Sequence, residues 1–223
     1  MIPDQNERLP PVLVKRAARL ATSTLANALD EAGIHDKVLN TLKAVSTGMK
    51  FAGTAMTVRE ITAQYGTFTS VDFRIGAIID AAQAGDVVVI DMAGAKCSTW
   101  GGMASLAAKV KGIEGLLVDG GVRDLEEMIE FDFPVFAAHL VPTTGRTRLK
   151  VETINQPVCL DGVIVEPGDL IVADGSGVVC LPKDKALELV SRAEEIQRDD
   201  EAAINEIRKG LSFSDAMKKF TGI

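Results

Sequence analysis

The feature that most constrains the fold is the segment Gly115–Asp124, an apolar run that ends in an acid, two glycines and an Arg-Asp pair. A helix-forming stretch, Leu125–Glu130, follows at once. This order is typical of a buried strand in an α/β protein, because ligand-binding groups collect where such strands end. Arg123 is a permanent cation with a planar fork, and Asp124 offers oxygen atoms to a metal ion or to hydrogen-bond donors. The pair therefore suits an anionic substrate held beside a divalent metal.

Strands and helices alternate on both sides of this segment, which indicates α/β units. In the first half, the hydrophobic pattern predicts a strand at 53–59, a helix at 71–83, a strand at 86–91, a helix at 101–111 and a strand at 115–119. In the second half, short strands predominate, at 134–138, 156–160, 163–165 and 170–172. Helices are expected at both ends of the chain, at 10–20, 22–32, 183–209 and from Ser214 onward. Thr22 or Ser23 is the expected cap of the second helix.

Two segments, 85–94 and 168–177, resemble each other. Each places Gly-Asp before an apolar strand, a second Asp six residues after the first glycine, and another Gly three residues later. Gly-Asp turns are common before strands, which is one explanation. The preferred interpretation is that the segments form two equivalent strands of a barrel-like β unit.

Charge and cysteine content narrow the class of protein. The chain has 24 basic and 31 acidic side chains, a net charge of −7, which argues against general nucleic-acid binding. Three widely spaced cysteines suggest neither a disulfide framework nor a CxxC metal site. The stretch Met1–Glu7 lacks the features of a signal peptide, and no apolar run reaches membrane-spanning length. We therefore expect a cytoplasmic protein with no nucleic-acid or membrane partner.

A second candidate for ligand binding is the pair Gly101 and Gly102, at the first turn of the helix predicted at 101–111. Glycines there let a ligand approach free backbone N–H groups, and a helix N-terminus favours an anion such as a carboxylate. Close packing of strand and helix explains the glycines equally well. If the strands at 86–91 and 115–119 are parallel neighbours, this turn and the Arg-Asp pair lie at one edge of the sheet.

Taken together, these segments resemble the signature of the RraA-like family, over roughly residues 20 to 182. The matching runs are Trp100–Ala104, Ala107–Gly112 and Gly115–Asp124, with support from Gly53–Ala55, Pro134–Ala137 and Gly162–Asp169. The family includes the class II 4-hydroxy-4-methyl-2-oxoglutarate (4-carboxy-4-hydroxy-2-oxoadipate) aldolases, which also decarboxylate oxaloacetate, and the regulator of ribonuclease E activity. Some members have been labelled menaquinone-pathway methyltransferases. Many of the aldolases carry Glu where this chain has Gly102.

The resemblance implies a swivelling β/β/α domain with flanking helices. The whole chain, 1–223, would be a single domain, with N-terminal helices in 1–34, the core in 50–182 and C-terminal helices in 183–223. It also implies a homotrimer or a dimer of trimers, with sites between subunits.

The resemblance also assigns roles to residues. Asp124 would hold Mg²⁺ or Mn²⁺, and Arg123 would contact the keto oxygen or a carboxylate of a small 2-keto acid. The backbone at Gly101, Gly102, Met103 and Ala104 would hold the pyruvyl carboxylate. Cleaving a carbon–carbon bond of a 2-keto acid leaves negative charge on an enolate oxygen, which a metal ion and a fixed guanidinium stabilise. We therefore expect a metal-dependent lyase that forms pyruvate.

Two other functions are considered. A non-catalytic regulator resembling the ribonuclease regulator is the main alternative, since it shares the Arg-Asp region. A methyltransferase is not expected, because Gly53–Val58 does not supply the glycine-rich turn of a nucleotide-type cofactor site.

Several other polar residues have open roles. His139 is a proton-transfer group or, by preference, a surface or core-edge residue. Asp119 orients Arg123, joins the metal site through a second layer of contacts, or simply ends the strand. Asp91 and Asp174 are expected to be turn acids. Solvated surface is preferred over a Schiff-base role for Lys96 and Lys109, and Cys97 has no evident His partner for a nucleophilic triad. Trp100 either lines the pocket or packs in the core.

Overall fold

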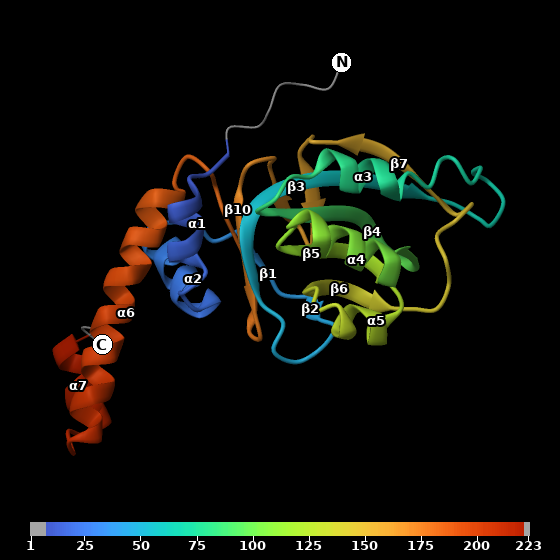
Figure 1. Cartoon of the computed structure of the whole chain (residues 1–223). Helices are drawn as coiled ribbons and strands as arrows, with labels where there is room; N and C mark the ends of the chain where they lie inside the picture. Colours follow the sequence, from blue (N-terminus) through green and yellow to red (C-terminus); the bar gives the residue numbers. More distant parts are fainter. Residues whose placement is uncertain (1–7, 221–223) are drawn as a thin grey trace.

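The computed structural model describes residues 8–220, in which a nine-stranded sheet carries helices on one face and at one end (Figure 1). The stretch Met1–Glu7 lies outside the described residues. Four neighbouring strands at the centre of the sheet run parallel. They are β3 (Phe51–Thr62), β4 (Asp86–Trp100), β5 (Gly115–Val122) and β6 (Val135–Leu140). Because their side chains are almost entirely buried, these strands appear in the sequence as continuous apolar runs.

Antiparallel strands extend the sheet on both sides, in the order β1-β11-β10-β3-β4-β5-β6-β2, with β7 paired to β3. Their bounds are β1 (Val38–Leu39), β2 (Lys43–Ala44), β7 (Leu149–Ile154), β10 (Leu170–Asp174) and β11 (Gly177–Leu181). A separate hairpin consists of β8 (Val158–Leu160) and β9 (Val163–Val165).

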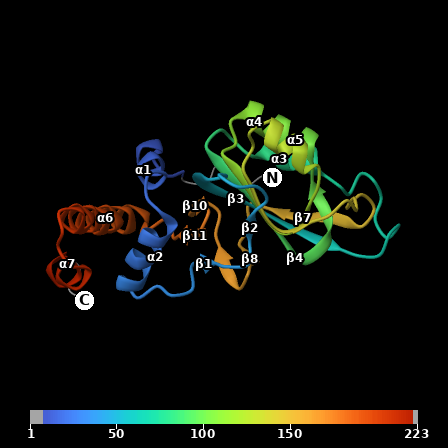
Figure 2. The same cartoon turned by 90° about the horizontal axis from the view of Figure 1, so that it is seen from below.

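Three helices cover one face of the parallel strands (Figure 2). They are α3 (Ile75–Ala81), α4 (Gly102–Lys111) and α5 (Leu125–Glu130). Buried residues such as Ile78 of α3, Ala108 of α4 and Met128 of α5 form a common core with the strands beneath. At the end of α4, Gly112 adopts φ 83°, the left-handed conformation that terminates many helices. The chain then enters β5, which brings its exit next to the start of α4.

The remaining helices pack at the β10–β11 end of the molecule (Figure 1). They are α1 (Pro11–Ala17), α2 (Thr22–Glu31), α6 (Ala186–Arg208) and α7 (Phe213–Phe220). The prediction that Thr22 or Ser23 caps α2 is wrong. Ala21 is the N-cap, and it makes no side-chain cap hydrogen bond. Asp174, at the end of β10, accepts hydrogen bonds from Thr22 N at 2.9 Å and Thr22 Oγ1 at 2.6 Å. A distant acid thus replaces the local cap that the sequence suggested.

The α/β class with flanking helices is confirmed, and the differences are local. The strand predicted at 86–91 continues to Trp100 through three register shifts, with Ala93 at φ 50° and Gly94 at φ 73°. Small and polar residues occupy this bulged part of the strand, so the continuous apolar run in the sequence ends early. The sequence analysis also missed β1, β2, β7 and β11 and made α3 too long. No helix within residues 8–220 has the length and apolar character needed to cross a bilayer.

The two similar segments both flank β3, but they are not equivalent strands. β4 runs parallel to β3, whereas β10 runs antiparallel to it, so that interpretation is wrong. The similarity is one of turn chemistry. Asp86 accepts a hydrogen bond from Gln83 N, and Asp169 accepts one from Glu166 N, each from three residues earlier.

Candidate functional site

The two loops singled out in the sequence meet in the structure. β4 and β5 are parallel neighbours, and Trp100 at the end of β4 is in register with Val122 at the end of β5. Arg123 N donates a hydrogen bond to Trp100 O at 3.0 Å. The first turn of α4 and the Arg-Asp pair therefore lie side by side at the carboxyl edge of the sheet.

Asp124 is held against the start of α4. Its backbone has φ 62°, and its Oδ2 accepts a hydrogen bond from Gly102 N at 3.2 Å. Arg123 Nε lies 3.5 Å from the same oxygen. A Cβ atom on Gly101 would overlap with Asp124 Oδ2, and it would lie 3.3 Å from Arg123 Nε. A side chain at position 101 would therefore displace the Asp124 carboxyl group.

Glu127 is a third charged group at this place, and the sequence analysis missed it. It lies in α5, three residues after Asp124, so both side chains project from one side of that helix start. A Cβ atom on Gly102 would lie 2.6 Å from Glu127 Cβ and still closer to its carboxyl oxygen. The carboxyl group of Glu127 therefore fills the space that a side chain at position 102 would take. The i, i+3 spacing was the available signal.

A cavity of about 490 Å³ opens in front of these groups. Its lining includes Arg123, Asp124, Glu127, the start of α4 and apolar side chains of the α3 region, among them Phe73, Ile75 and Ile79. The amides of Met103 and Ala104 belong to the first helical turn and have no acceptor within the helix. The cavity thus combines a guanidinium and helix amides, which suit a carboxylate, with two carboxylates, which suit a cation.

The acids of this cavity fit a magnesium-type ion. Among the described residues, no three His, Cys, Asp or Glu side chains come together as a metal-binding group. Mg²⁺ is commonly bound through one or two carboxylates and retains several waters, unlike Zn²⁺, which takes three or four protein ligands. Asp124 and Glu127 supply such a pair of carboxylates, with Asp124 partly exposed at 36%.

Glu60 is a buried acid beside this cavity. Its side chain is only 4% exposed, and its Oε1 accepts a hydrogen bond from Thr99 Oγ1 at 2.9 Å. Thr99 itself lines the cavity. Burial raises the pKa of Glu60 to about 7, against the opposing effect of the hydrogen bond from Thr99. The apolar pattern of β3 gave no sign that its single buried acid belongs to the site.

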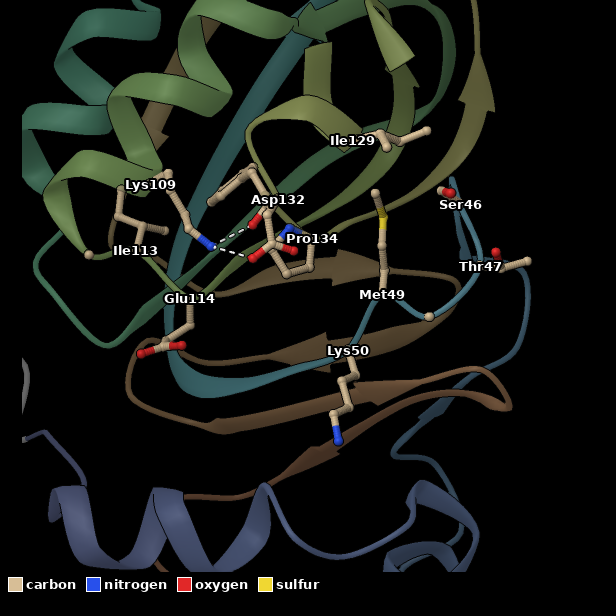
Figure 3. A pocket seen from close by; sticks show the side chains of 13 residues that line it. Ser46, Thr47, Met49, Lys50, Lys109, Ile113, Glu114, Ile129, Asp132 and Pro134 are labelled. Carbon is tan, nitrogen blue, oxygen red and sulfur yellow. Dashed lines mark hydrogen bonds and ion pairs between the residues drawn. The ribbon is translucent and has the colours of Figure 1, made fainter. Parts of the chain in front are cut away.

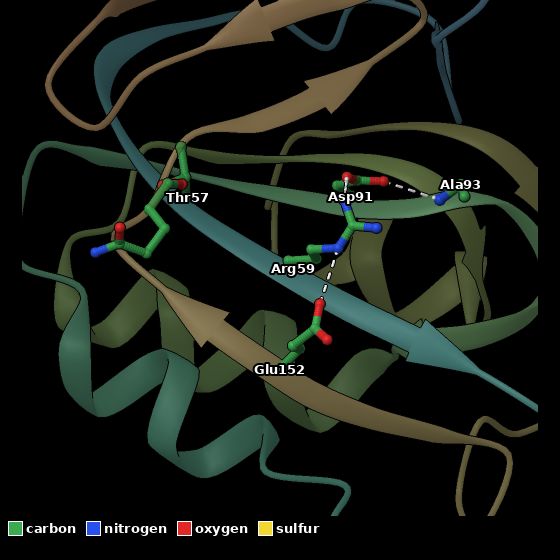
Figure 4. Close-up of polar contacts among 6 residues, drawn as sticks. Thr57, Arg59, Asp91, Ala93 and Glu152 are labelled. Atoms are coloured by element: carbon green, nitrogen blue, oxygen red, sulfur yellow. Dashed lines mark hydrogen bonds and ion pairs between the residues drawn. The ribbon is translucent and has the colours of Figure 1, made fainter.

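Asp91, another acid singled out in the sequence, lies in a separate polar cluster with Arg59 and Glu152 (Figure 4). Asp91 accepts a hydrogen bond from Ala93 N at 3.0 Å and pairs with Arg59 at 3.1 Å, while Arg59 also binds Glu152. Asp91 and Asp174 are thus turn acids, as predicted; Asp174 accepts a hydrogen bond from Ser176 N.

Asp119 and His139 do not line the cavity of Arg123. Burial, followed by the charges of Asp91 and Asp161, raises the pKa of Asp119. His139 Nε2 lies 3.2 Å from Gly94 O at the edge of the sheet, which agrees with a core-edge residue.

A larger cavity of about 560 Å³ lies at the opposite edge of the sheet, where β5 and β6 begin (Figure 3). Lys109 pairs there with Asp132 at 2.9 Å, and its side chain is 45% exposed. Lys96 is also exposed, and Cys97 is buried with no disulfide partner. Lys109 is thus a surface residue, as predicted, and it does not line the cavity of Arg123. Trp100 is buried, donates to Ser105 Oγ and also lines the smaller cavity, so both of its proposed roles apply.

The chain is similar in sequence to several known proteins. An uncharacterised protein of Methanocaldococcus jannaschii is 34% identical over 92% of this chain and 96% of its own length. A protein of Halalkalibacterium halodurans with the provisional name 4-hydroxy-4-methyl-2-oxoglutarate aldolase is 30% identical over 82% of each chain.

Among solved structures, a Streptomyces coelicolor protein described as an unusual member of the RNase ES inhibitor RraA family superposes with a TM-score of 0.76. It is 30% identical and covers 92% of this chain and 99% of its own. The model of the RraA-like family, described as Aldolase/RraA, matches residues 22–180. With a family match over most of its length and the same fold, the chain belongs to the RraA-like family.

Proposed function

We propose that this protein is a divalent-metal-dependent lyase that cleaves a carbon–carbon bond of a small 2-keto acid to give pyruvate. The substrates in view are 4-hydroxy-4-methyl-2-oxoglutarate and oxaloacetate. The observation that carries the proposal is the convergence of Arg123, Asp124 and the first turn of α4 on one cavity. Relatives that are 30% and 34% identical carry the name 4-hydroxy-4-methyl-2-oxoglutarate aldolase, which supports the proposal.

Different groups of the cavity would bind the carboxylate and the keto oxygen of the substrate. The carboxylate of the 2-keto acid would accept hydrogen bonds from the amides of Met103 and Ala104, where the helix dipole is positive. Arg123 would donate to the keto oxygen, on which negative charge grows as the bond breaks. The hydrogen bond from Arg123 N to Trp100 O holds the Arg123 backbone beside the first turn of α4.

Asp124 would hold Mg²⁺ or Mn²⁺, with Glu127 as a second carboxylate nearby. When bound, the metal ion would polarise the keto group and stabilise the developing enolate. Gly102 N donates to Asp124 Oδ2, which fixes the carboxylate in one orientation.

The test is pyruvate formation from oxaloacetate and from 4-hydroxy-4-methyl-2-oxoglutarate, with Mg²⁺ or Mn²⁺ and with a chelator. Asp124→Asn is the informative variant, since Asn keeps the shape and tolerates the left-handed backbone. Asp132→Asn is its matched control, because Asp132 also has positive φ but lies in the other cavity. We expect Asp124→Asn to abolish chelator-sensitive turnover and Asp132→Asn to retain it. Wild-type pyruvate formation no faster than without protein would refute the proposal.

We also propose that the chain forms a homotrimer or a dimer of trimers. Helices α4 and α5 expose four apolar side chains: Met103, Leu106, Val110 and Ile129. An apolar patch of this kind is costly to leave in water. Light scattering of wild type and Val110→Glu would test it, with a smaller assembly expected for the variant.

A non-catalytic regulator is the second candidate, because the Streptomyces relative is described as a member of an RNase inhibitor family. The two candidates differ in turnover. Metal-dependent pyruvate formation that is lost in Asp124→Asn favours the lyase; its absence in the wild type favours the regulator.

A cytoplasmic location is proposed as well, since the three cysteines are free thiols.

A further inference from the structure

Glu60 has a hydrogen-bonding deficit that the fold does not explain. One carboxyl oxygen accepts from Thr99 Oγ1, but the other, Oε2, is buried and has no hydrogen-bond partner in the described structure. Leaving a buried polar atom unpaired is unfavourable, and doing so with a charged carboxylate is more so. Such a group calls for a functional explanation. Thr99, which donates to the other carboxyl oxygen, borders the cavity of Arg123.

We propose that Glu60 and Thr99 form a proton relay that delivers the proton required when pyruvate is formed in the cavity. This inference rests on the proposed function and adds a proton donor to the Arg123 and Asp124 site. Thr99 borders the cavity, with 2% of its surface exposed, and Glu60 acts through it.

The proton balance of the reaction requires such a donor. When oxaloacetate loses CO₂, its C3–C4 bond breaks and the electron pair moves onto the pyruvate fragment as an enolate. The enolate must gain one proton at C3 to become pyruvate. In the relay, the hydrogen bond between the two side chains reverses, so that the neutral Glu60 carboxyl group donates to Thr99 Oγ1. The Thr99 hydroxyl gives its own proton to C3 and takes the proton of Glu60. Glu60 is left as a carboxylate until it regains a proton from solvent.

The surroundings of Glu60 favour a stored proton. Burial raises the pKa of Glu60 to about 7, so a large fraction is neutral near neutral pH. Cys97 of β4 is a titratable group near Glu60. Burial is the larger cause that raises the pKa of its thiol, and the charge of Glu60 is the second. Arg148 acts on the same thiol in the opposite direction. Of the acids that line the cavity, Asp124 accepts a hydrogen bond from Gly102 N, and Glu127 is exposed to solvent.

The sharpest test is exchange of the pyruvate methyl hydrogens with D₂O, followed by proton NMR in the presence of Mg²⁺. This exchange runs the protonation step alone, without cleavage of a carbon–carbon bond. We compare wild type with Glu60→Gln, which cannot ionise, and with Thr99→Val, which has no hydroxyl. Thr99→Ser is the matched control because it keeps the hydroxyl.

In Glu60→Gln and Thr99→Val we expect exchange and kcat to fall by about 10²-fold, the lower range for loss of general acid–base catalysis. KM should change little, and Thr99→Ser should retain most of the rate. The limb of the kcat pH profile near the pKa of Glu60 should disappear in Glu60→Gln. A readout independent of turnover is the infrared band of a protonated carboxyl group at pH 6, expected in wild type and missing in Glu60→Gln.

The outcomes separate this inference from the proposed function. If wild type forms pyruvate but Glu60→Gln keeps its exchange rate and pH profile, the relay is refuted and the lyase stands. If wild type neither forms pyruvate nor exchanges its methyl hydrogens, both fail. Absence of the infrared band at pH 6 also refutes the relay. If Glu60→Gln does not fold, Thr99→Val against Thr99→Ser decides, and equal exchange in the two refutes the relay.

Discussion

Glu127 lies directly against Gly102, so that α5 supplies an acidic group exactly where α4 has no side chain. A Cβ atom on Gly102 would lie 2.6 Å from Glu127 Cβ, which no real pair of side chains tolerates. Asp124, from the same helix start, binds the amide of Gly102. The amide of Gly102 thus holds Asp124, and the missing side chain at position 102 leaves the space that Glu127 occupies.

Gly102→Ala should destabilise the protein by about 1–3 kcal/mol, the usual cost of overpacking a filled space. Gly76→Ala in α3 is the matched control, because no atom lies within 4 Å of the added Cβ. Alanine there should be neutral or stabilising by up to about 1 kcal/mol, from helix propensity. Urea unfolding of the two variants measures both effects. Equal stability would show that Glu127 moves aside freely.

Arg123→Lys should lower kcat by about 10²-fold or more with oxaloacetate, although the charge is kept. The planar guanidinium can donate two parallel hydrogen bonds to a carboxylate or keto acid, and an ammonium group cannot reproduce that geometry. Steady-state kinetics with Mg²⁺ measure the change. Lys109→Arg, in the opposite cavity, is the control and should leave kcat unaltered. Full activity of Arg123→Lys would mean that only charge matters at this position.

The meeting of the two loops could be predicted from the sequence because it depends on parallel neighbouring strands and on little else. Gly101 and Arg123 each follow a buried strand, and adjacent parallel strands end at the same edge. Glu127 and Glu60 could not be identified in the same way. Their roles depend on which side chains face them across the fold, Gly102 in one case and Thr99 in the other.

The same reasoning explains the errors in the fold. The two-residue strands β1 and β2 are too short to show a period, and the continuous apolar run of β4 ends at Asp91, where its bulged part begins. The cap of α2 was misplaced because Asp174 lies far away in sequence, 152 residues from Thr22. Local patterns predict elements well where the deciding contacts are local.

Asp174→Ala should destabilise the protein by about 1–3 kcal/mol, since it leaves buried donors of Thr22 without an acceptor. Although burial opposes it, the hydrogen bonds from Thr22 lower the pKa of Asp174. The carboxylate therefore stabilises the fold above the ordinary pKa of Asp, and this contribution is lost as the pH falls through the lowered value. Urea unfolding at neutral and acidic pH should show the gap closing in acid. Ser23→Ala, at the exposed alternative cap, should change the stability by less than about 0.5 kcal/mol.

Glu60 should make the protein less stable as the pH rises. Burial raises its pKa from 4.5 to about 7, so between these values the folded chain keeps a proton that the unfolded chain releases. The free energy of unfolding then falls with rising pH, by about 3 kcal/mol in all for a shift of this size. Glu60→Gln has no such proton, so its stability relative to wild type should increase by that amount between pH 4.5 and pH 8. Urea unfolding of both proteins across this range measures the difference.

Glu126→Gln, at an exposed acid of α5, is the control and should follow wild type. Parallel curves for wild type and Glu60→Gln would mean that Glu60 titrates as it does in the unfolded chain, and that no proton is stored beside Thr99.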